Sequence, residues 1–381
     1  MIENKLHNIK GVSHYRIIYN GSANIEPKGY KGISHLIEHC MCEKIKEFEQ
    51  EFKEKAISWN ACTSSNKVWF YISGMSKYIR TFINEYTNAI LNYQISEEVF
   101  NREKNIVITE YFQSYSDQTN AFILNFNRKH YNNCEAIGYI EDLKNLTYEN
   151  FMSYKNKIFN KPSKIIYVHH KSEKNLSKDD LFSIDFNNIK EYTNNMIYDT
   201  YNEYPIETYA TFDNQRIIAL NTNLTLDKEC KNITYANLFK ACILKGLTSP
   251  LYIELREKLQ CVYSLYGDVN KIDNNTFSFN IFVFTTEEGK NIVLNKLKEI
   301  IVNIKKYINK DLYKRNVSLY KNSHKISDLI NWDNVSSELD EQCKNLILKN
   351  KINYKDFLQY IDTFLNSDIK YVIDEQYIKK D

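Results

Sequence analysis

The sequence predicts an α+β fold of two structurally similar domains, each a mainly antiparallel sheet packed against helices. Two observations support this prediction. Segments rich in β-branched and aromatic residues alternate with longer segments of helical spacing, and the same order of segments occurs in both halves of the 381 residues. A polar stretch rich in Lys, Asp and Asn separates the halves. We therefore place a first domain at residues 1–172, a linker at 173–194 and a homologous second domain at 195–381.

The first half alternates strands with helices. Its predicted strands are short, β-branched and aromatic: residues 12–20, one or two strands within 57–73, and residues 163–169. Its predicted helices are residues 33–55, residues 76–93, a helix that opens at Ser96 and runs past Glu110, and further helices to about 157.

The second half repeats this order after the linker. Its predicted strands are residues 208–220, strands within 261–284 and a last strand at 369–374. Its predicted helices are residues 233–246, residues 288–306 and more helix to about 365. Because the order of segments recurs, the sequence indicates an internal duplication.

The charge balance limits the classes of partner. Fifty Lys and Arg residues accompany 48 Asp and Glu residues, so the net charge is only +2. Nucleic-acid-binding proteins are normally clearly basic, so we expect no nucleic-acid partner. No apolar run approaches the roughly 20 residues of a membrane span, and the N-terminal segment lacks the apolar core of a signal peptide. We therefore expect a cytoplasmic protein without a membrane partner, whose eight cysteines are free thiols.

The sharpest local signal is the motif H-x-x-E-H, formed by His35, Glu38 and His39. On a helix, positions i and i+4 share one face, so both imidazoles can reach one metal ion. Glu38 is adjacent to His39 and one turn from His35, so its carboxylate can lie beside the metal as a general base. The alternative is two surface histidines that meet by chance, since a short motif carries a false-positive risk.

A catalytic zinc site needs three protein ligands and one open position, so a third ligand must come from elsewhere. Glu103 and Glu110 are seven residues apart in a predicted helix and share a face. An ordinary solvated helix face is the alternative for this pair.

At these residues the chain resembles the pitrilysin–insulinase family of inverted-motif zinc peptidases, which includes the mitochondrial processing peptidases. The motif is followed by R-E-x6-E, which places Glu110 71 residues after His39. Three further segments resemble the family in the same order. They are NACTS at 60–64, GYIEDLKNLTYENF at 138–151 and SPLYIELREKLQCVYSLYG at 249–267.

The resemblance implies roles around one zinc ion per chain. His35, His39 and Glu110 would be the zinc ligands, and Glu38 would be the general base that activates a zinc-bound water. Glu103 would be a carboxylate behind the ligands that orients one of them. Only the first domain would carry zinc.

The resemblance also implies residues that contact an extended peptide. Asn60 and Ala61 would lie on a strand edge that pairs with the substrate, and Arg256 and Tyr263 of the second domain would contact it from the other side. Long members of the family carry four such domains, with the zinc helix in the first and the Arg–Tyr pair in the last. Because this chain carries both features, we expect a homodimer with sites completed in trans, or a heterodimer with a zinc-less homologue.

The chain departs from the family pattern directly after the motif, where CMCEKIKEFEQ replaces the usual Gly-Thr. Cys40 and Cys42 could be proposed there as soft zinc ligands. Cys40 is adjacent to His39, however, and therefore points about 100° away from the histidine face of a helix.

These observations predict a zinc-dependent endopeptidase that acts on peptides or unfolded segments. A non-catalytic peptide-binding or scaffold subunit on the same fold is the main alternative, because a fold does not guarantee a function. The presence of Glu38 and of all three candidate ligands argues against a decayed site. A zinc hydrolase of non-peptide substrates is a third possibility, which the NACTS strand disfavours.

Overall fold

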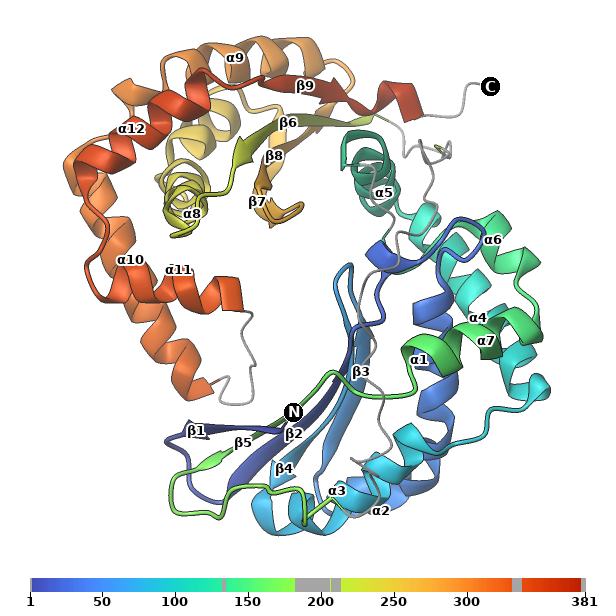
Figure 1. Cartoon of the computed structure of the whole chain (residues 1–381). Helices are drawn as coiled ribbons and strands as arrows, with labels where there is room; N and C mark the ends of the chain where they lie inside the picture. Colours follow the sequence, from blue (N-terminus) through green and yellow to red (C-terminus); the bar gives the residue numbers. More distant parts are fainter. Residues whose placement is uncertain (1, 132–134, 182–205, 207–213, 331–337, 378–381) are drawn as a thin grey trace. The chain divides into compact units, whose positions relative to one another are not determined.

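The computed structural model describes residues 2–131, 135–181, 206, 214–330 and 338–377. The described residues up to Ile206 form one compact unit, and those from Asn214 onwards form a second (Figure 1). Both units combine a sheet with helices, so the predicted α+β class is confirmed.

The first unit contains a five-stranded sheet of order β1-β5-β2-β4-β3. Its strands are β1 (Ile2–His7), β2 (Val12–Tyr19), β3 (Ser58–Thr63), β4 (Val68–Met75) and β5 (Lys164–His170). The pairs β2–β4, β2–β5 and β3–β4 are antiparallel, whereas β1 pairs in parallel with β5. Strand β3 therefore lies at one edge of this sheet.

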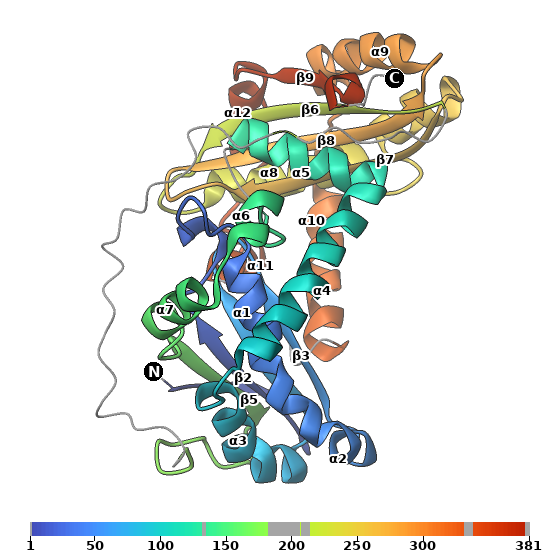
Figure 2. The same ribbon diagram turned by 90° about the vertical axis from the view of Figure 1, so that its right-hand side faces the viewer.

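Two helices, α1 (Ile33–Cys42) and α3 (Ser76–Leu91), pack directly on one face of this sheet (Figure 2). The other helices of the unit are α2 (Glu49–Glu54), α4 (Glu97–Ser116), α5 (Gln118–Tyr131), α6 (Ile140–Asn145) and α7 (Tyr148–Ile158), with short 3-10 helices η1 (Ala23–Ile25) and η2 (Glu43–Phe48). Alternate residues of β2 and β4 point towards the helices, and Tyr15, Ile17, Phe70 and Ile72 are fully buried there. Leu36 and Ile37 of α1 join the same core, so burial of its apolar face fixes α1 against the sheet.

The second unit repeats the strand order of the first. Its sheet has the order β7-β8-β6-β9, formed by β6 (Gln215–Thr225), β7 (Val262–Lys271), β8 (Thr276–Thr286) and β9 (Lys370–Ile373). All its pairs are antiparallel. When β2, β3, β4 and β5 are matched with β6, β7, β8 and β9, the two orders are the same, apart from the additional β1.

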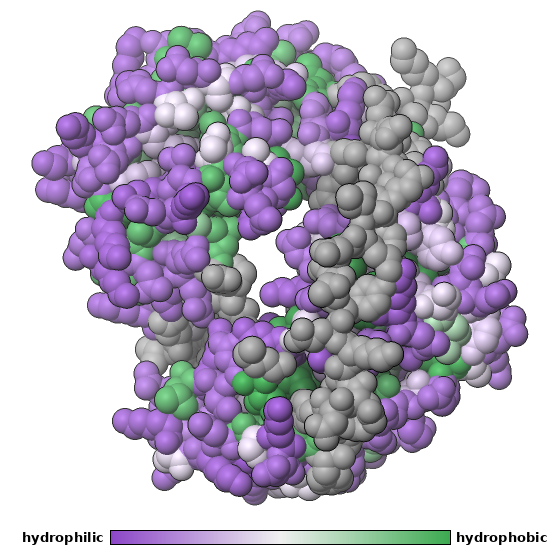
Figure 3. Space-filling model, viewed as in Figure 1, coloured by the Kyte–Doolittle hydropathy of each residue, from purple (hydrophilic) through white to green (hydrophobic). Residues whose placement is uncertain are grey.

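The helices of the second unit occupy equivalent places in the chain. They are α8 (Lys231–Leu244), η3 (Tyr252–Lys258, a π-helix), α9 (Lys290–Val302), η4 (Ile304–Lys306), α10 (Lys310–Ile330), α11 (Glu338–Leu348), α12 (Tyr354–Leu365) and η5 (Asp374–Tyr377). α8 follows β6, as α1 follows the matching strand β2, but α8 carries no histidine. On the face shown in Figure 3, hydrophilic residues predominate over α10 and α12.

Most predicted elements are present, with three differences. The predicted helix 33–55 divides at Cys42 into α1, η2 and α2. Strand β1 was not predicted, because only Ile2 and Leu6 of its 6 residues are apolar and it is held by pairing with the distant β5. The predicted strand 208–220 begins at Gln215, and its residues 208–213 lie outside the described part of the chain.

The start of the predicted linker packs on the first unit. Leu176 and Leu181 are buried in the first core, and the Glu173 carboxylate accepts a hydrogen bond from Ser76 Oγ. The first residues of the predicted linker thus contact the first unit, and its residues 182–194 lie outside the described part of the chain. Within the residues that the structure describes, none of the helices combines the length and apolar character needed to cross a bilayer.

Candidate metal centre

A buried polar anchor fixes the first turn of α1, the helix that carries the motif. Gly32 precedes the helix with φ of 100°, a left-handed conformation that favours glycine. The Glu26 carboxylate accepts hydrogen bonds from the backbone N–H groups of Gly32 at 2.8 Å and of Ser34 at 2.7 Å. A carboxylate at a helix N-terminus satisfies otherwise unpaired N–H groups. His35 directly follows Ser34, so its position is fixed both by the packing of α1 in the core and by the hydrogen bonds to Glu26.

Three side chains from α1 and α4 converge at one point. The Nε2 atoms of His35 and His39 lie 3.2 Å apart. Glu110 Oε2 lies 3.7 Å from Nε2 of His35 and 3.6 Å from Nε2 of His39. α1 and α4 pack directly against each other, which brings Glu110 to the histidines across a long stretch of sequence. Within the described residues this group has the geometry and chemistry to hold a metal ion.

The donor set fits zinc. Two ligand atoms about 2.0 Å from a zinc ion in tetrahedral geometry lie about 3.3 Å apart, close to the three observed separations. Two imidazoles and one carboxylate are the ligand types of catalytic zinc sites, which leave a fourth position open. Burial lowers the pKa of His35 to about 3, so this imidazole is neutral and its nitrogen can bind a cation.

Glu38 lies beside this group and points towards β3. The Thr63 hydroxyl donates a hydrogen bond of 2.6 Å to Glu38 Oε2. Burial raises the pKa of the Glu38 carboxyl, while the Thr63 hydrogen bond and the nearby His39 oppose that rise. A carboxylate with a raised pKa, held in place beside a metal site, is a stronger base than an ordinary carboxylate and so is better suited to take and return a proton.

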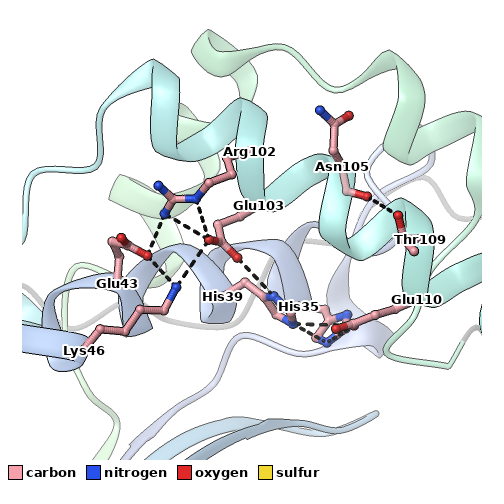
Figure 4. A network of polar contacts seen from close by, with 9 residues as sticks. All are labelled: His35, His39, Glu43, Lys46, Arg102, Glu103, Asn105, Thr109 and Glu110. Atoms are coloured by element: carbon pink, nitrogen blue, oxygen red, sulfur yellow. Dashed lines mark hydrogen bonds and ion pairs between the residues drawn. The ribbon is translucent and has the colours of Figure 1, made fainter. Parts of the chain in front are cut away.

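Glu103 lies behind His39 and is almost completely buried. Its Oε2 is 3.4 Å from Nδ1 of His39. Its Oε1 faces Arg102 and Lys46, which both also contact Glu43 (Figure 4). Carboxylates that accept the second N–H of a ligating histidine fix the ring and its tautomer, which is the role predicted for Glu103.

The two cysteines of α1 do not belong to this group. Cys40 is fully buried in the apolar core. Burial raises the pKa of both the Cys40 and Cys42 thiols, so neither is the thiolate that a metal requires. The proposal of soft thiolate ligands is therefore not supported.

Asn60 and Ala61 lie on β3, the strand that also carries Thr63. In the described part of the chain, β3 pairs with β4 alone. The Ala61 N–H donates to the Asn60 side-chain oxygen at 2.9 Å, so this amide points away from β4 towards the outer edge. The strand edge predicted to accept substrate thus lies next to the residue that holds Glu38.

Arg256 and Tyr263 belong to the second unit. Arg256 is exposed on η3, with its guanidinium 5.1 Å above the ring of Tyr252. Tyr263 is 50% exposed and occupies the bulge of β7, between the paired residues Val262 and Ser264. Bulges commonly re-aim a side chain next to a functional site. Their contact with substrate stays a prediction.

Comparison with known proteins agrees with this geometry. Residues 7–138 match the model of the insulinase family, peptidase family M16. A protein from Rickettsia felis described as an uncharacterized zinc protease is 23% identical over 301 residues, which cover 74% of this chain and 70% of that protein. The first third of the chain is thus similar to the insulinase family. The predicted resemblance to this family is therefore confirmed.

Solved structures share the fold of the whole chain. A protease from Helicobacter pylori matches with a TM-score of 0.69 and 16% identity, covering 96% of this chain and 90% of that one. A structure described as a peptidase M16 inactive domain from Pseudomonas fluorescens matches with a TM-score of 0.70 and 11% identity, covering 98% and 94%. At these identities the likeness concerns the fold.

Sequence reasoning missed the residues that hold this candidate site in place. Thr63 lies within the NACTS segment, but the motif does not indicate that its hydroxyl contacts Glu38. Lys46 and Arg102 were not predicted to contact Glu103, although Arg102 is adjacent to Glu103 in the sequence and could have been considered. Nothing in the sequence indicated the role of Glu26, because it binds backbone N–H groups, which no residue pattern marks.

Proposed function

We propose that this chain is a zinc-dependent endopeptidase that hydrolyses peptides or unfolded segments, with one zinc ion per chain. The observation that carries the proposal is the placement of Glu38. It lies beside the converging His35, His39 and Glu110 and is held by Thr63. When bound, zinc supplies Lewis-acid chemistry, since it acidifies water and polarises a carbonyl group.

The chain's own residues supply the rest of the reaction. His35, His39 and Glu110 would hold the metal, and Glu103 would orient His39. Glu38 would take a proton from the attacking water and return it to the leaving amine. The raised pKa of Glu38 suits both transfers.

The substrate would add to the outer edge of β3. An extended peptide can pair with an exposed strand through main-chain hydrogen bonds, whereas a folded segment cannot. The outward Ala61 N–H would exchange its hydrogen bond to the Asn60 side chain for one to the peptide. This supports peptides or unfolded segments as the substrate class.

Two measurements on purified protein test the proposal. Elemental analysis should find about one zinc per chain, and a quenched-fluorescence peptide library should be cleaved. Glu38→Gln should keep its zinc but lose about 10²–10⁴-fold in turnover, because general-base catalysis contributes that much. Glu110→Gln, as the matched change at a ligand, should instead lose zinc. Near-normal turnover of Glu38→Gln, or wild-type protein without zinc after supplementation, would contradict the proposal.

A non-catalytic peptide-binding subunit is the second candidate. It is favoured by the similarity to the Pseudomonas fluorescens structure described as an inactive domain. This candidate expects peptide binding without cleavage in the wild-type chain. The same peptide library separates the two, because binding without any product would favour the subunit.

We propose the cytoplasm as the location. The seven cysteines in the described part of the chain are all free, which suits a reducing compartment.

A further inference from the structure

The contacts of Glu103 divide its two carboxylate oxygens between separate tasks. Oε2 faces Nδ1 of His39 at 3.4 Å. Oε1 accepts hydrogen bonds from Arg102, from Nη2 at 3.1 Å and Nε at 3.2 Å, and lies 3.6 Å from Nζ of Lys46. The side chain of Glu103 is only 4% exposed. A buried carboxylate needs such cations, because an unpaired buried charge is costly.

Glu43 fixes the two cations to each other. Its Oε2 accepts from Arg102 Nη2 at 2.6 Å and from Lys46 Nζ at 2.7 Å (Figure 4). Arg102 and Lys46 come from different elements, α4 and η2, and Glu43 joins them on the side facing Glu103. Without Glu43 these two half-exposed side chains would sample more rotamers, because fixing an exposed side chain in one ion-pair geometry costs conformational entropy.

The division of the predicted helix 33–55 creates this arrangement. Residues 43–48 form the 3-10 helix η2 instead of continuing α1. In a 3-10 helix, side chains at i and i+3 eclipse each other, so Glu43 and Lys46 project on the same side. That side faces α4, where Arg102 and Glu103 lie.

We propose that Lys46 and Arg102, tied together by Glu43, are positioning residues for the metal centre. They hold Oε1 of Glu103, so that Oε2 receives the Nδ1–H of His39. The ring of His39 is thereby fixed with the unprotonated Nε2 towards Glu110 and His35. Nδ1 of His35 is buried without a hydrogen-bond partner in the described residues, so His39 is the ligand whose ring a carboxylate orients. This inference rests on the proposed function only in that the bound metal is zinc.

Zinc affinity, measured by competition with a chelator at one pH, tests the proposal without any peptide substrate. Lys46→Met keeps the aliphatic stem and removes the charge, and it should weaken zinc binding by about 10-fold, since partners behind the ligands contribute about 10–100-fold. Arg102→Met should act in the same direction, and Lys46→Arg should restore the affinity. Lys44→Met is the matched control, because Lys44 lies in the same 3-10 helix but pairs with Glu47 at 2.6 Å. It should stay within about 2-fold of wild type.

A double variant shows whether the effect passes through Glu103. In a Glu103→Gln background, Lys46→Met should cause no further loss, because the carboxylate to be held is absent. The visible spectrum of the cobalt-substituted protein should change in Lys46→Met and not in Lys44→Met, since it reports ligand geometry. Wild-type zinc affinity in Lys46→Met, or an equal loss in the Glu103→Gln background, would overturn the positioning role while leaving the endopeptidase intact. A wild-type chain that binds zinc but cleaves no peptide would overturn the proposed function alone, and one that binds no zinc would overturn both.

Discussion

At the scale of single residues, the candidate site contains a set that the sequence predicts and a set that it does not. His35, Glu38 and His39 follow from helical periodicity, because their spacing puts both imidazoles on one face. Glu110 follows from resemblance and not from spacing, since nothing local links it to His39 across 71 residues. Thr63 escapes prediction because the partner of a hydroxyl depends on how β3 packs beside α1.

Thr63 is expected to contribute to turnover and not to metal binding. Thr63→Val keeps the shape of the side chain and removes the donor to Glu38 Oε2. A hydrogen bond to a charged group contributes about 1.5–3 kcal/mol, so kcat/KM should fall about 10-fold or more. The pKa of Glu38 should rise further, because the lost donor stabilised the carboxylate, and the acidic limb of the pH profile should move to higher pH.

Peptide cleavage across a pH series and zinc content check this expectation. Thr109→Val is the matched control, because its hydroxyl donates only within α4, to the Asn105 carbonyl at 2.9 Å. Zinc content should be unchanged in both variants. A Thr63→Val enzyme with wild-type kcat/KM would show that Thr63 does not hold the base.

At the scale of elements, the sequence predicts the type of most segments but not where they bend. The helical pattern of 33–55 has no proline to mark a boundary. The 3-10 helix that begins at Glu43 packs against α1 and α3, so the change of helix type depends on tertiary contacts that the local sequence does not encode. The Glu26 anchor at the N-terminus of α1 could not be predicted from the sequence either. A buried carboxylate that accepts backbone N–H groups needs a particular loop path, which composition does not encode.

The Glu26 anchor should make stability depend on pH. Burial raises the pKa of Glu26 to about 7, against opposing effects of Lys31 and of the Gly32 and Ser34 N–H groups. A carboxyl whose pKa is raised in the folded state stabilises most below its unfolded pKa, and that stabilisation is lost as pH rises through the folded pKa. Between about pH 5.5 and pH 8 the free energy of unfolding of the wild type should therefore fall by about 2 kcal/mol relative to that of Glu26→Gln.

Urea unfolding of the metal-free protein at both pH values, with and without the substitution, measures this difference. Subtracting the result for Glu26→Gln from that for the wild type cancels the pH dependence that comes from titratable groups present in both proteins. His35 belongs to these groups, and its lowered pKa makes stability rise with pH only up to the ordinary histidine range. If the free energy of unfolding of the wild type instead increased relative to that of Glu26→Gln as pH rises, the ionised carboxylate would be the stabilising form.

At the scale of the whole molecule, the repetition of element order predicted two units of the same type, and the two sheets share one strand order. Order could be predicted because each strand and helix leaves its own local pattern. The unequal roles of the units could not follow from order alone, since α1 and α8 occupy equivalent places and only α1 carries the motif. The chain thus combines one candidate metal centre with one Arg–Tyr pair.

We propose that two chains complete each other's sites, with Arg256 and Tyr263 of one subunit serving the metal centre of its partner. Twofold-symmetric dimers are the commonest assembly, and this arrangement would use every predicted site residue of the chain. A heterodimer with a zinc-less homologue remains the alternative, and purification from the native source would reveal a second chain. Subunit mixing tests the homodimer directly.

Glu38→Gln chains and Tyr263→Phe chains should each be inactive or weak alone. When they are co-assembled in equal amounts, about half of the dimers are mixed, and each mixed dimer has one site with an intact Glu38 and an intact Tyr263 from its partner. About a quarter of wild-type activity should return. Mixing Glu38→Gln with Glu110→Gln is the control, because both changes affect the metal centre of their own chain and no intact site can form. A fully active monomer, or mixed dimers that recover nothing, would rule out sites completed in trans. Neither result would affect the assignment of the zinc ligands, because that assignment is tested separately by metal content.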